Sequence, residues 1–336
     1  MPSRYPTSPI LRLSLGVVGA AMLGCAGQPS GVPQRVVIPP GTTMRAAADS
    51  LARAGVIDAP RLFRIYADVE GRDRGIKPGT YLLQRHLAWR DALDALTRGK
   101  GLVHTVTIPE GWELREIAPL LARALSLPPE SIAAAVRDPA LRERVGISAP
   151  TLEGYLFPDT YTFPDGCSAR VAVAEMVHAF EREWRPQWDS VARAAGLSRS
   201  DAVTLASIIE KEARRPDERP LISGVYHNRL QRHMPLQADP TIQYALGHHV
   251  ERVTFKDLEV ASPYNTYRHL GLPPGPIGSP GVASLDAAVS PAAVPYLYFV
   301  AAPDGHHEFR TTFAEHMAAR RALRRATHRP AEGAAP

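Results

Sequence analysis

Two glutamates lie two residues apart at the end of a predicted helix. A Ser-x-x-Asp capping box at 198–201 opens this helix and Pro216 closes it, so we expect about four turns over 201–215. At about 100° per residue, Glu212 falls inside the apolar stripe of the helix and Glu210 at its border. Burial and the negative end of the helix dipole both disfavour a charged carboxyl. Glu212 therefore has the expected properties of a general acid that protonates a glycosidic oxygen.

The same residues also allow a purely structural interpretation. An ion pair between Glu212 and Arg214 or Arg215 would simply stabilise the helix end. Other chemistries have less support, because the sequence contains no Gly-x-Ser-x-Gly elbow, phosphate loop or His-Glu-x-x-His motif. The histidine pairs at 248–249 and 306–307 lie in predicted loops. We therefore expect neither a metal site nor a cofactor.

The elements before this helix include an internal repeat. A short strand, a Pro/Gly turn and an amphipathic helix at 36–53 recur at 106–123 with a constant offset of 70 residues. Residues 77–83 and 89–97 predict another strand and helix. Strands that return after single helices form a small α/β unit, which resembles the LysM domains that hold glycan chains. A packing scaffold without a ligand is the alternative.

From about residue 148 the sequence alternates aromatic and Pro-rich loops with helices. It predicts a helix at 171–188, a loop at 270–280, where Pro and Gly exclude a helix, a strand at 296–300 and a closing helix at 312–326. The expected fold class is α+β, with a small LysM-like α/β N-terminal domain followed by a mixed α+β catalytic domain.

The N-terminus has the features of an export signal. Arg4 and Arg12 precede an apolar run at 13–23, which is shorter than the ~20 residues that span a bilayer. Cys25 follows a glycine and resembles the lipid-attachment site of bacterial lipoproteins. A lipid anchor, a short membrane anchor and plain secretion all remain open. The other cysteine, Cys167, lies far away, so we expect no disulfide framework.

The charge balance is mildly basic. The chain has 39 Lys and Arg against 34 Asp and Glu, a formal net charge of +5. We locate this excess in the C-terminal tail, where five arginines crowd residues 320–329. A solvated tail explains them, and we expect no nucleic-acid partner.

Six motifs occur in the order seen in the YceG-like family of endolytic murein transglycosylases. They lie at 206–212, 225–230, 236–241, 262–267, 271–277 and 296–300. Residues 153–161 resemble the family's Glu-Gly-x-x-Phe-Pro-Asp-Thr block, and the resemblance covers about residues 35–325. The essential acid of the family maps onto the second glutamate of Glu-Lys-Glu, which is Glu212. The family usually carries a clear transmembrane helix, and the short run that ends at Cys25 departs from that pattern.

The resemblance implies cleavage inside nascent glycan strands, with 1,6-anhydro-N-acetylmuramic acid ends as products. It implies peptidoglycan glycan strands and cell-wall synthases (penicillin-binding proteins) as partners, and an N-terminus on the membrane. The protein would lie at the inner membrane or envelope with its catalytic domain facing the periplasm or exterior. Candidate substrate-binding residues are Gln237, Asp239, Asn265, Tyr267, Glu153 and Tyr155. Glu210 is a second candidate acid, and a non-catalytic scaffold or a hydrolytic muramidase is the alternative.

These observations predict four segments. Residues 1–30 form a signal or anchor, 31–104 a LysM-like domain that positions glycan, 105–325 the catalytic transglycosylase domain, and 326–336 a basic, disordered tail.

Overall fold

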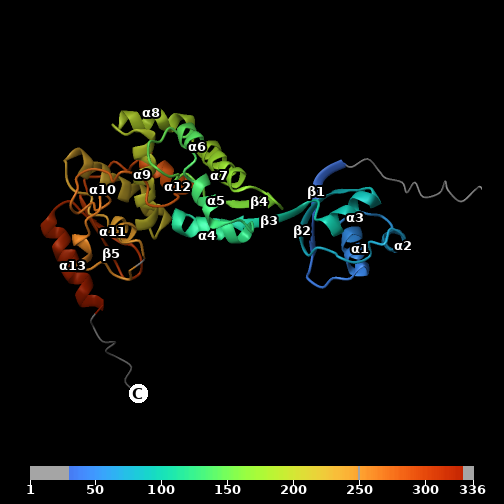
Figure 1. Cartoon of the computed structure of the whole chain (residues 1–336). Coiled ribbons are helices and arrows are strands. Elements are labelled where there is room, and N and C mark those ends of the chain that lie inside the picture. The colour runs from blue at the N-terminus through green and yellow to red at the C-terminus, as the bar shows by residue number, and fades with distance from the viewer. Residues whose placement is uncertain (1–29, 249, 328–336) are drawn as a thin grey trace, which may run out of the picture. The chain divides into compact units, whose positions relative to one another are not determined.

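The computed structural model describes residues 30–248 and 250–327. The chain divides between His104 and Thr105 into two compact units, each with its own hydrophobic core (Figure 1). The predicted export segment with Cys25, and residues 328–336 of the predicted tail, lie outside the described residues. Within the described ranges, no helix has the length and apolar character needed to cross a membrane.

The N-terminal unit places its helices against an antiparallel sheet. Its elements are β1 (Ser30–Ile38), α1 (Met44–Arg53), α2 (Pro60–Val69), β2 (Gly79–Arg85), α3 (Trp89–Arg98) and the start of β3 (Leu102–Thr107). β2 pairs antiparallel with both β1 and β3. Val36 and Ile38 are buried and Val37 between them is exposed, so the sheet buries one face. The segment between β1 and β2 contains two helices and not the single helix we expected, because Pro60 starts a second one.

The 70-residue repeat forms the same local structure twice. Gly41 and Gly111 have φ values of 74° and 77°, in the left-handed region that favours glycine. Thr43 is the N-cap of α1, and Glu113 is the N-cap of α4 (Leu114–Ala124). The second copy belongs to the C-terminal unit, so the repeat does not define a separate domain.

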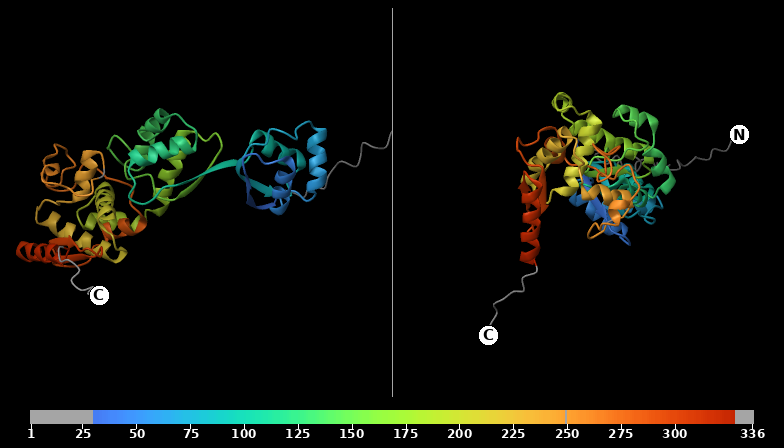
Figure 2. Two further views of the ribbon diagram at one scale, coloured as in Figure 1. Left: turned by 90° about the horizontal axis from the view of Figure 1, so that it is seen from below. Right: turned by 90° about the vertical axis from the view of Figure 1, so that its left-hand side faces the viewer.

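The C-terminal unit is mainly helical. After the end of β3 its elements are α4, α5 (Pro129–Ala135), α6 (Pro139–Arg144), β4 (Thr160–Pro164), α7 (Ala169–Glu183), α8 (Pro186–Ala194), α9 (Arg199–Glu212), α10 (Arg219–Gln231), α11 (Asp239–Leu246), α12 (Val282–Val289), β5 (Tyr298–Ala301), β6 (His307–Arg310) and α13 (Phe313–Thr327). Helix α9 packs against α8, α10, α11 and α12. β5 and β6 form an antiparallel hairpin, and α13 packs against it at the periphery of the unit (Figures 1 and 2).

The fold is therefore mixed α+β with antiparallel sheets, in agreement with the predicted class. The helix predicted at 171–188 is wrong, since the structure has two helices there. The break lies at Trp184 and Arg185, because Pro186 disfavours a helical conformation in the residue before it. Residues 270–280 form an irregular loop, as predicted.

Candidate active site

Helix α9 carries the two predicted acids at the edge of the core of the C-terminal unit, where both residues are partly buried. Its residues 202–209 are all buried, so packing fixes the helix on every side. The predicted capping box is present: Ser198 N–H donates to the Asp201 carboxylate at 2.9 Å, and Asp201 N–H donates to the Ser198 hydroxyl at 3.1 Å. The helix ends at Glu212, three residues earlier than predicted, because Ala213 already has an extended backbone.

The Glu212 carboxyl has a hydroxyl partner and no cationic one. The Tyr226 hydroxyl donates to Glu212 Oε1 at 3.0 Å. Among the described residues no Lys, Arg or His forms an ion pair with Glu212, and neither Arg214 nor Arg215 serves as the partner that the structural interpretation required. Burial raises the pKa of Glu212 to about 7, with the Tyr226 hydrogen bond acting in the opposite direction. The carboxyl is thus partly protonated at neutral pH, as we predicted.

Glu210 has the opposite environment. Its side chain is 6 % exposed and forms an ion pair with Arg219 at 2.9 Å, and it accepts the Gly281 N–H at 3.0 Å. A carboxylate paired in this way holds Arg219 and the Gly281 backbone together. Glu210 is therefore more buried than the border position we predicted. Its role as a second acid is not supported, because both carboxylate oxygens already have partners.

Glu212 opens onto a pocket of about 440 Å³. Its walls come from α9, α10, the start of α11, β5, β6 and α13. Gln237, Asp239 and Tyr267 line the same pocket, so three of the six predicted substrate-binding residues lie beside the predicted acid. Gln237 and Asp239 are exposed to solvent in the pocket and are accessible to a ligand.

These three pocket residues are held in place by their own chain. The Tyr267 hydroxyl donates to Asp239 Oδ1, and the Gln237 N–H donates to the Thr266 carbonyl at 3.1 Å. Gln237 has a φ of 50°, a conformation that a residue with a side chain adopts rarely and at some cost. The amide of Gln237 is thus presented to the pocket from a strained turn.

Asn265 does not lie in the pocket, which corrects our expectation. Its side chain is fully buried, and its Nδ2 donates to the carbonyls of Leu258 and Val260 at 2.9 Å each. Its Oδ1 accepts the Tyr267 N–H at 3.0 Å. Because these bonds occupy the amide, Asn265 organises the loop that presents Tyr267 and has no free group for a sugar.

Glu153 and Tyr155 are also corrected by the structure. The Glu153 carboxylate accepts the Leu114 N–H at 3.0 Å and the Tyr244 hydroxyl at 3.3 Å, so it caps the start of α4. Tyr155 is fully buried, with its ring edge-on to Phe180 at 5.0 Å between ring centres. Neither residue lines the pocket of Glu212, and sugar binding by them is not supported.

Two residues beside the predicted acid were not named in the sequence analysis: Arg229 lines the pocket, and Tyr226 hydrogen-bonds to Glu212 without lining it. Tyr226 and Arg229 both lie on α10, inside a motif that carried the family resemblance. The Arg229 guanidinium donates to the carbonyls of Leu297 and Leu236 at 2.7 Å each, and burial lowers its pKa. Their one-turn spacing on a buried helix was the available signal.

The geometry defines a class of site: a carboxyl whose pKa is raised to about 7 by burial faces a polar pocket, as an acid–base residue of an enzyme would. Comparison with known proteins places the chain more narrowly. The model of the YceG-like family matches residues 36–322, and the chain belongs to this family.

Similar proteins are known from several bacteria. The chain is 32% identical to an endolytic murein transglycosylase of Bacillus subtilis, over 90% of this chain and 88% of that protein. It is 31% identical to a protein of the same name from Streptococcus pneumoniae, covering 79% of this chain and about half (54%) of that longer one. A crystal structure of a yceG-like protein from Listeria monocytogenes is 34% identical with a TM-score of 0.62, covering 84% of this chain and 97% of that one.

Proposed function

We propose that this protein is an endolytic peptidoglycan lytic transglycosylase and that Glu212 is its catalytic acid and base. The observation that carries the proposal is the contrast between neighbouring glutamates. Glu210 is neutralised by Arg219, whereas Glu212 has a pKa of about 7 and opens onto a polar pocket. The family membership and the names of the relatives support the same activity.

The reaction needs one carboxyl in two protonation states. Protonated Glu212 donates its proton to the oxygen that links N-acetylmuramic acid to N-acetylglucosamine, as the bond from muramic C1 to that oxygen breaks. The resulting carboxylate accepts the proton of the muramic 6-hydroxyl, whose oxygen bonds to C1 and closes the 1,6-anhydro ring. No water is consumed and a second catalytic carboxylate is not required, in contrast to ordinary glycoside hydrolysis.

The residues around Glu212 have separate tasks in this scheme. Tyr226 holds Oε1, which leaves Oε2 to face the substrate. The buried Arg229 cation favours the carboxylate that forms after the first proton transfer. Gln237, Asp239 and Tyr267 are positioned to bind sugar hydroxyls or N-acetyl groups at the pocket wall.

Cleavage inside nascent strands would end their elongation by the synthases, and the substrate is the glycan strand of peptidoglycan. We propose that residues 105–325 perform the chemistry and that residues 31–104, as a LysM-like unit, position glycan near the membrane. The protein would act on the outer side of the inner membrane, held there by residues 1–30.

Product analysis tests the proposed reaction. Purified murein is digested with the protein, and the products are analysed by mass spectrometry. A lytic transglycosylase yields muramic ends lighter than reducing ends by one water. Reducing muramic ends would show a hydrolytic muramidase instead, and no release of fragments would show a non-catalytic scaffold.

A further inference from the structure

Helix α2 leaves a row of large apolar side chains in solvent. Leu62 and Ile65 are each 56% exposed and Val69 is 77% exposed. At about 100° per residue these three lie within about 60° of arc, on the side of α2 opposite to the buried Ala67. We call them the α2 stripe. A contiguous exposed apolar patch of this kind marks a contact with a partner or a membrane.

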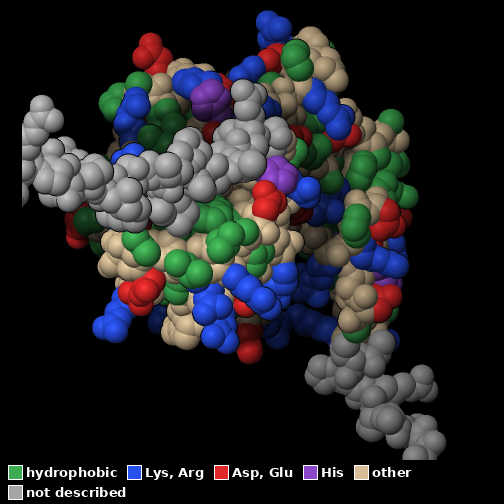
Figure 3. Space-filling view, turned by 90° about the vertical axis from the view of Figure 1, so that its right-hand side faces the viewer, with side chains coloured by type: hydrophobic (Ala, Val, Ile, Leu, Met, Phe, Trp, Pro, Cys, Tyr) green, Lys and Arg blue, Asp and Glu red, His purple; other side chains and the backbone are tan. Residues whose placement is uncertain are grey.

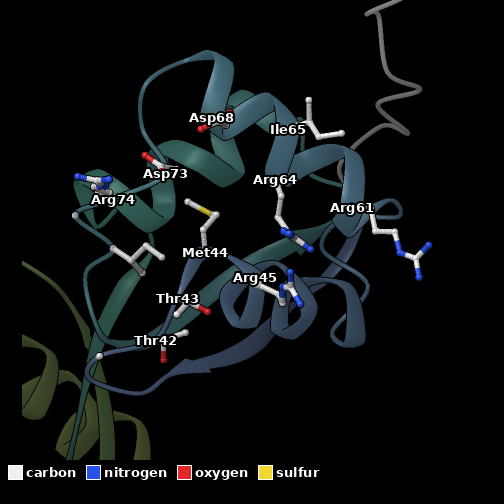
Figure 4. A pocket seen from close by; sticks show the side chains of 13 residues that line it. Thr42, Thr43, Met44, Arg45, Arg61, Arg64, Ile65, Asp68, Asp73 and Arg74 are labelled. Carbon is white, nitrogen blue, oxygen red and sulfur yellow. The ribbon is translucent and has the colours of Figure 1, made fainter.

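A basic pocket lies beside the α2 stripe. It has a volume of about 910 Å³, and Arg45, Arg61, Arg64 and Arg74 line it. The side chains of Arg45 and Arg64 reach toward each other from α1 and α2 (Figure 4). In the part of the chain that the structure describes, none of these four arginines forms an ion pair with an acidic residue. Cations that converge without a carboxylate partner favour an anionic ligand.

The charge distribution over the chain favours the same ligand. Residues 30–104 contain 12 Lys and Arg against 7 Asp and Glu, a net charge of +5, whereas residues 105–336 contain 25 against 27, a net charge of −2. The N-terminal unit is therefore basic in its own right, whereas the five arginines of the C-terminal tail are offset by acidic residues elsewhere in 105–336, so the tail is not the sole source of the basic excess, contrary to our expectation. Seen from the side on which α2 lies in Figure 1, this unit shows exposed hydrophobic side chains next to a group of Lys and Arg side chains (Figure 3).

The lining of the basic pocket suits phosphate better than a sugar ring. No aromatic side chain is among its lining residues, so it offers no surface on which a sugar ring stacks. Asp68 and Asp73 line it as well, yet the arginines outnumber them four to two. Guanidinium groups match the geometry of phosphate oxygens and form two parallel hydrogen bonds to them.

We propose that the α2 stripe and the basic pocket bind an anionic lipid surface. The arginines contact headgroup phosphates, while Leu62, Ile65 and Val69 enter the interface between headgroups and acyl chains. The proposal rests in part on the proposed anchor: Cys25 lies five residues before Ser30, and five residues reach at most about 17 Å, so a lipid on Cys25 would lie within that distance of the start of β1. Docking through α2 would orient the N-terminal unit on the membrane and leave its other faces for glycan.

A fluorescence experiment on the full chain tests this docking. An environment-sensitive dye is attached to a cysteine that replaces Leu62, and the protein is reconstituted in vesicles of phosphatidylcholine with phosphatidylglycerol, or of phosphatidylcholine alone. Quenching by nitroxide-labelled lipid measures the contact. We expect strong quenching in the anionic vesicles and its loss in phosphatidylcholine alone or at 1 M salt, where the screening length falls to about 3 Å.

Matched controls decide the outcome. Val37→Cys carries the same dye on the opposite face of the sheet, where 54% exposure gives equal access, and the unsubstituted chain gives the background from its native cysteines. The pair Arg45→Ala and Arg64→Ala should reduce quenching at residue 62 to the level at residue 37. Equal quenching at residues 62 and 37 would overturn the proposal, and so would quenching that is the same in anionic and in neutral vesicles. Loss of quenching on addition of purified glycan strands would also overturn it, because the same surface would then bind glycan.

Murein cleavage by each labelled protein is measured in parallel. Quenching without cleavage would contradict the proposed function and support the membrane contact, so the two failures are distinguishable.

Discussion

The Tyr226 hydroxyl lies 3.0 Å from Glu212 Oε1, and this hydrogen bond joins adjacent helices α9 and α10 at the wall of the pocket. Two residues earlier on α9, Glu210 meets Arg219 at 2.9 Å. One turn of helix thus carries a carboxyl whose pKa is raised to about 7 by burial and another that forms an ion pair with an arginine. Because the two glutamates have different partners, replacing each by glutamine should have opposite effects: loss of activity at Glu212 and loss of stability at Glu210.

Glu212→Gln should abolish murein cleavage and leave the fold intact. The amide has nearly the shape of the carboxyl but neither donates the proton to the leaving oxygen nor accepts one from the 6-hydroxyl. The loss should reach at least the ~10²- to 10⁴-fold typical of general acid–base catalysis, measured as the release of anhydro-muropeptides. Above pH 7 the variant should also be more stable than the parent, because it removes a buried charge.

Glu210→Gln is the matched control. It leaves Arg219 with only the more distant Glu110 carboxylate, at 3.9 Å, so thermal unfolding should show a destabilisation below the about 3–5 kcal/mol of a fully broken buried pair, while the folded fraction keeps cleaving murein. An inactive Glu210→Gln together with an active Glu212→Gln would mean that the assignment of the acid is reversed.

Tyr226→Phe should change the pH dependence of cleavage. The hydroxyl donates to the charged form of Glu212 and so lowers its pKa against the effect of burial. Without this hydrogen bond the Glu212 carboxyl keeps its proton to higher pH. The alkaline limb of the pH–rate profile should therefore shift to higher pH. Tyr244→Phe removes a hydroxyl from Glu153, outside the pocket, and should leave the limb in place. A profile that does not move in Tyr226→Phe would contradict the positioning role.

Local signals in the sequence predicted much of α9. The capping box, the apolar residues and the following proline are all near neighbours in the chain, so they determined that the helix exists and where it starts. Helical phase also placed Glu212 on the buried side. What separates Glu212 from Glu210 is tertiary contact: Arg219, nine residues after Glu210, comes from another helix, α10, and Gly281 lies 71 residues after Glu210. Periodicity carries no information about such partners.

Dependence on tertiary contacts also explains why the sequence did not distinguish the pocket residues from Asn265. Gln237, Asp239 and Asn265 are all polar residues in Pro-rich, turn-forming sequence, so their types alone predicted the same role. The structure directs Gln237 and Asp239 into the pocket and uses every hydrogen bond of Asn265 inside its loop. Which way a loop side chain points depends on the tertiary packing of the loop, and this appears only in the folded chain.

Asn265→Ala should therefore act on stability and not directly on substrate affinity. The substitution leaves the carbonyls of Leu258 and Val260 without their buried donor, at a cost of about 1–3 kcal/mol each, so the melting temperature should fall. Gln237→Asn is the comparison, because asparagine tolerates the positive φ while its shorter side chain withdraws from the pocket. It should raise KM with little change in melting temperature. A parental KM in the Gln237→Asn variant would show that the Gln237 side chain does not bind the substrate.

Cys25→Ser tests the anchor. If a lipid on Cys25 retains the protein, the variant should move from the membrane fraction to the soluble fraction after cell lysis and centrifugation. Retention equal to the parent would favour a membrane span of the preceding apolar run. The Cys167→Ser variant is the control, because that thiol is buried in the C-terminal unit and should not affect partitioning.

The stability of Glu153→Gln at different pH values should distinguish two roles of Glu153, capping of helix α4 and binding of a sugar. Burial raises the pKa of Glu153 to about 7 in the folded state, against 4.5 as the ordinary value. Between these two values the folded chain binds more protons than the unfolded chain, so the stability of the parent falls as pH rises from about 4.5 through 7. Glutamine still accepts the Leu114 N–H but carries no charge.

The variant should therefore match the parent near pH 4 and exceed its free energy of unfolding by up to about 3 kcal/mol at pH 8. Denaturant titrations at the two pH values measure this difference. Glu153→Ala, which loses the hydrogen bond to the Leu114 N–H, should have a lower free energy of unfolding than the parent at pH 4. KM for murein should stay at the parental value. A raised KM in Glu153→Gln, with no gain in stability at pH 8, would restore Glu153 as a substrate ligand.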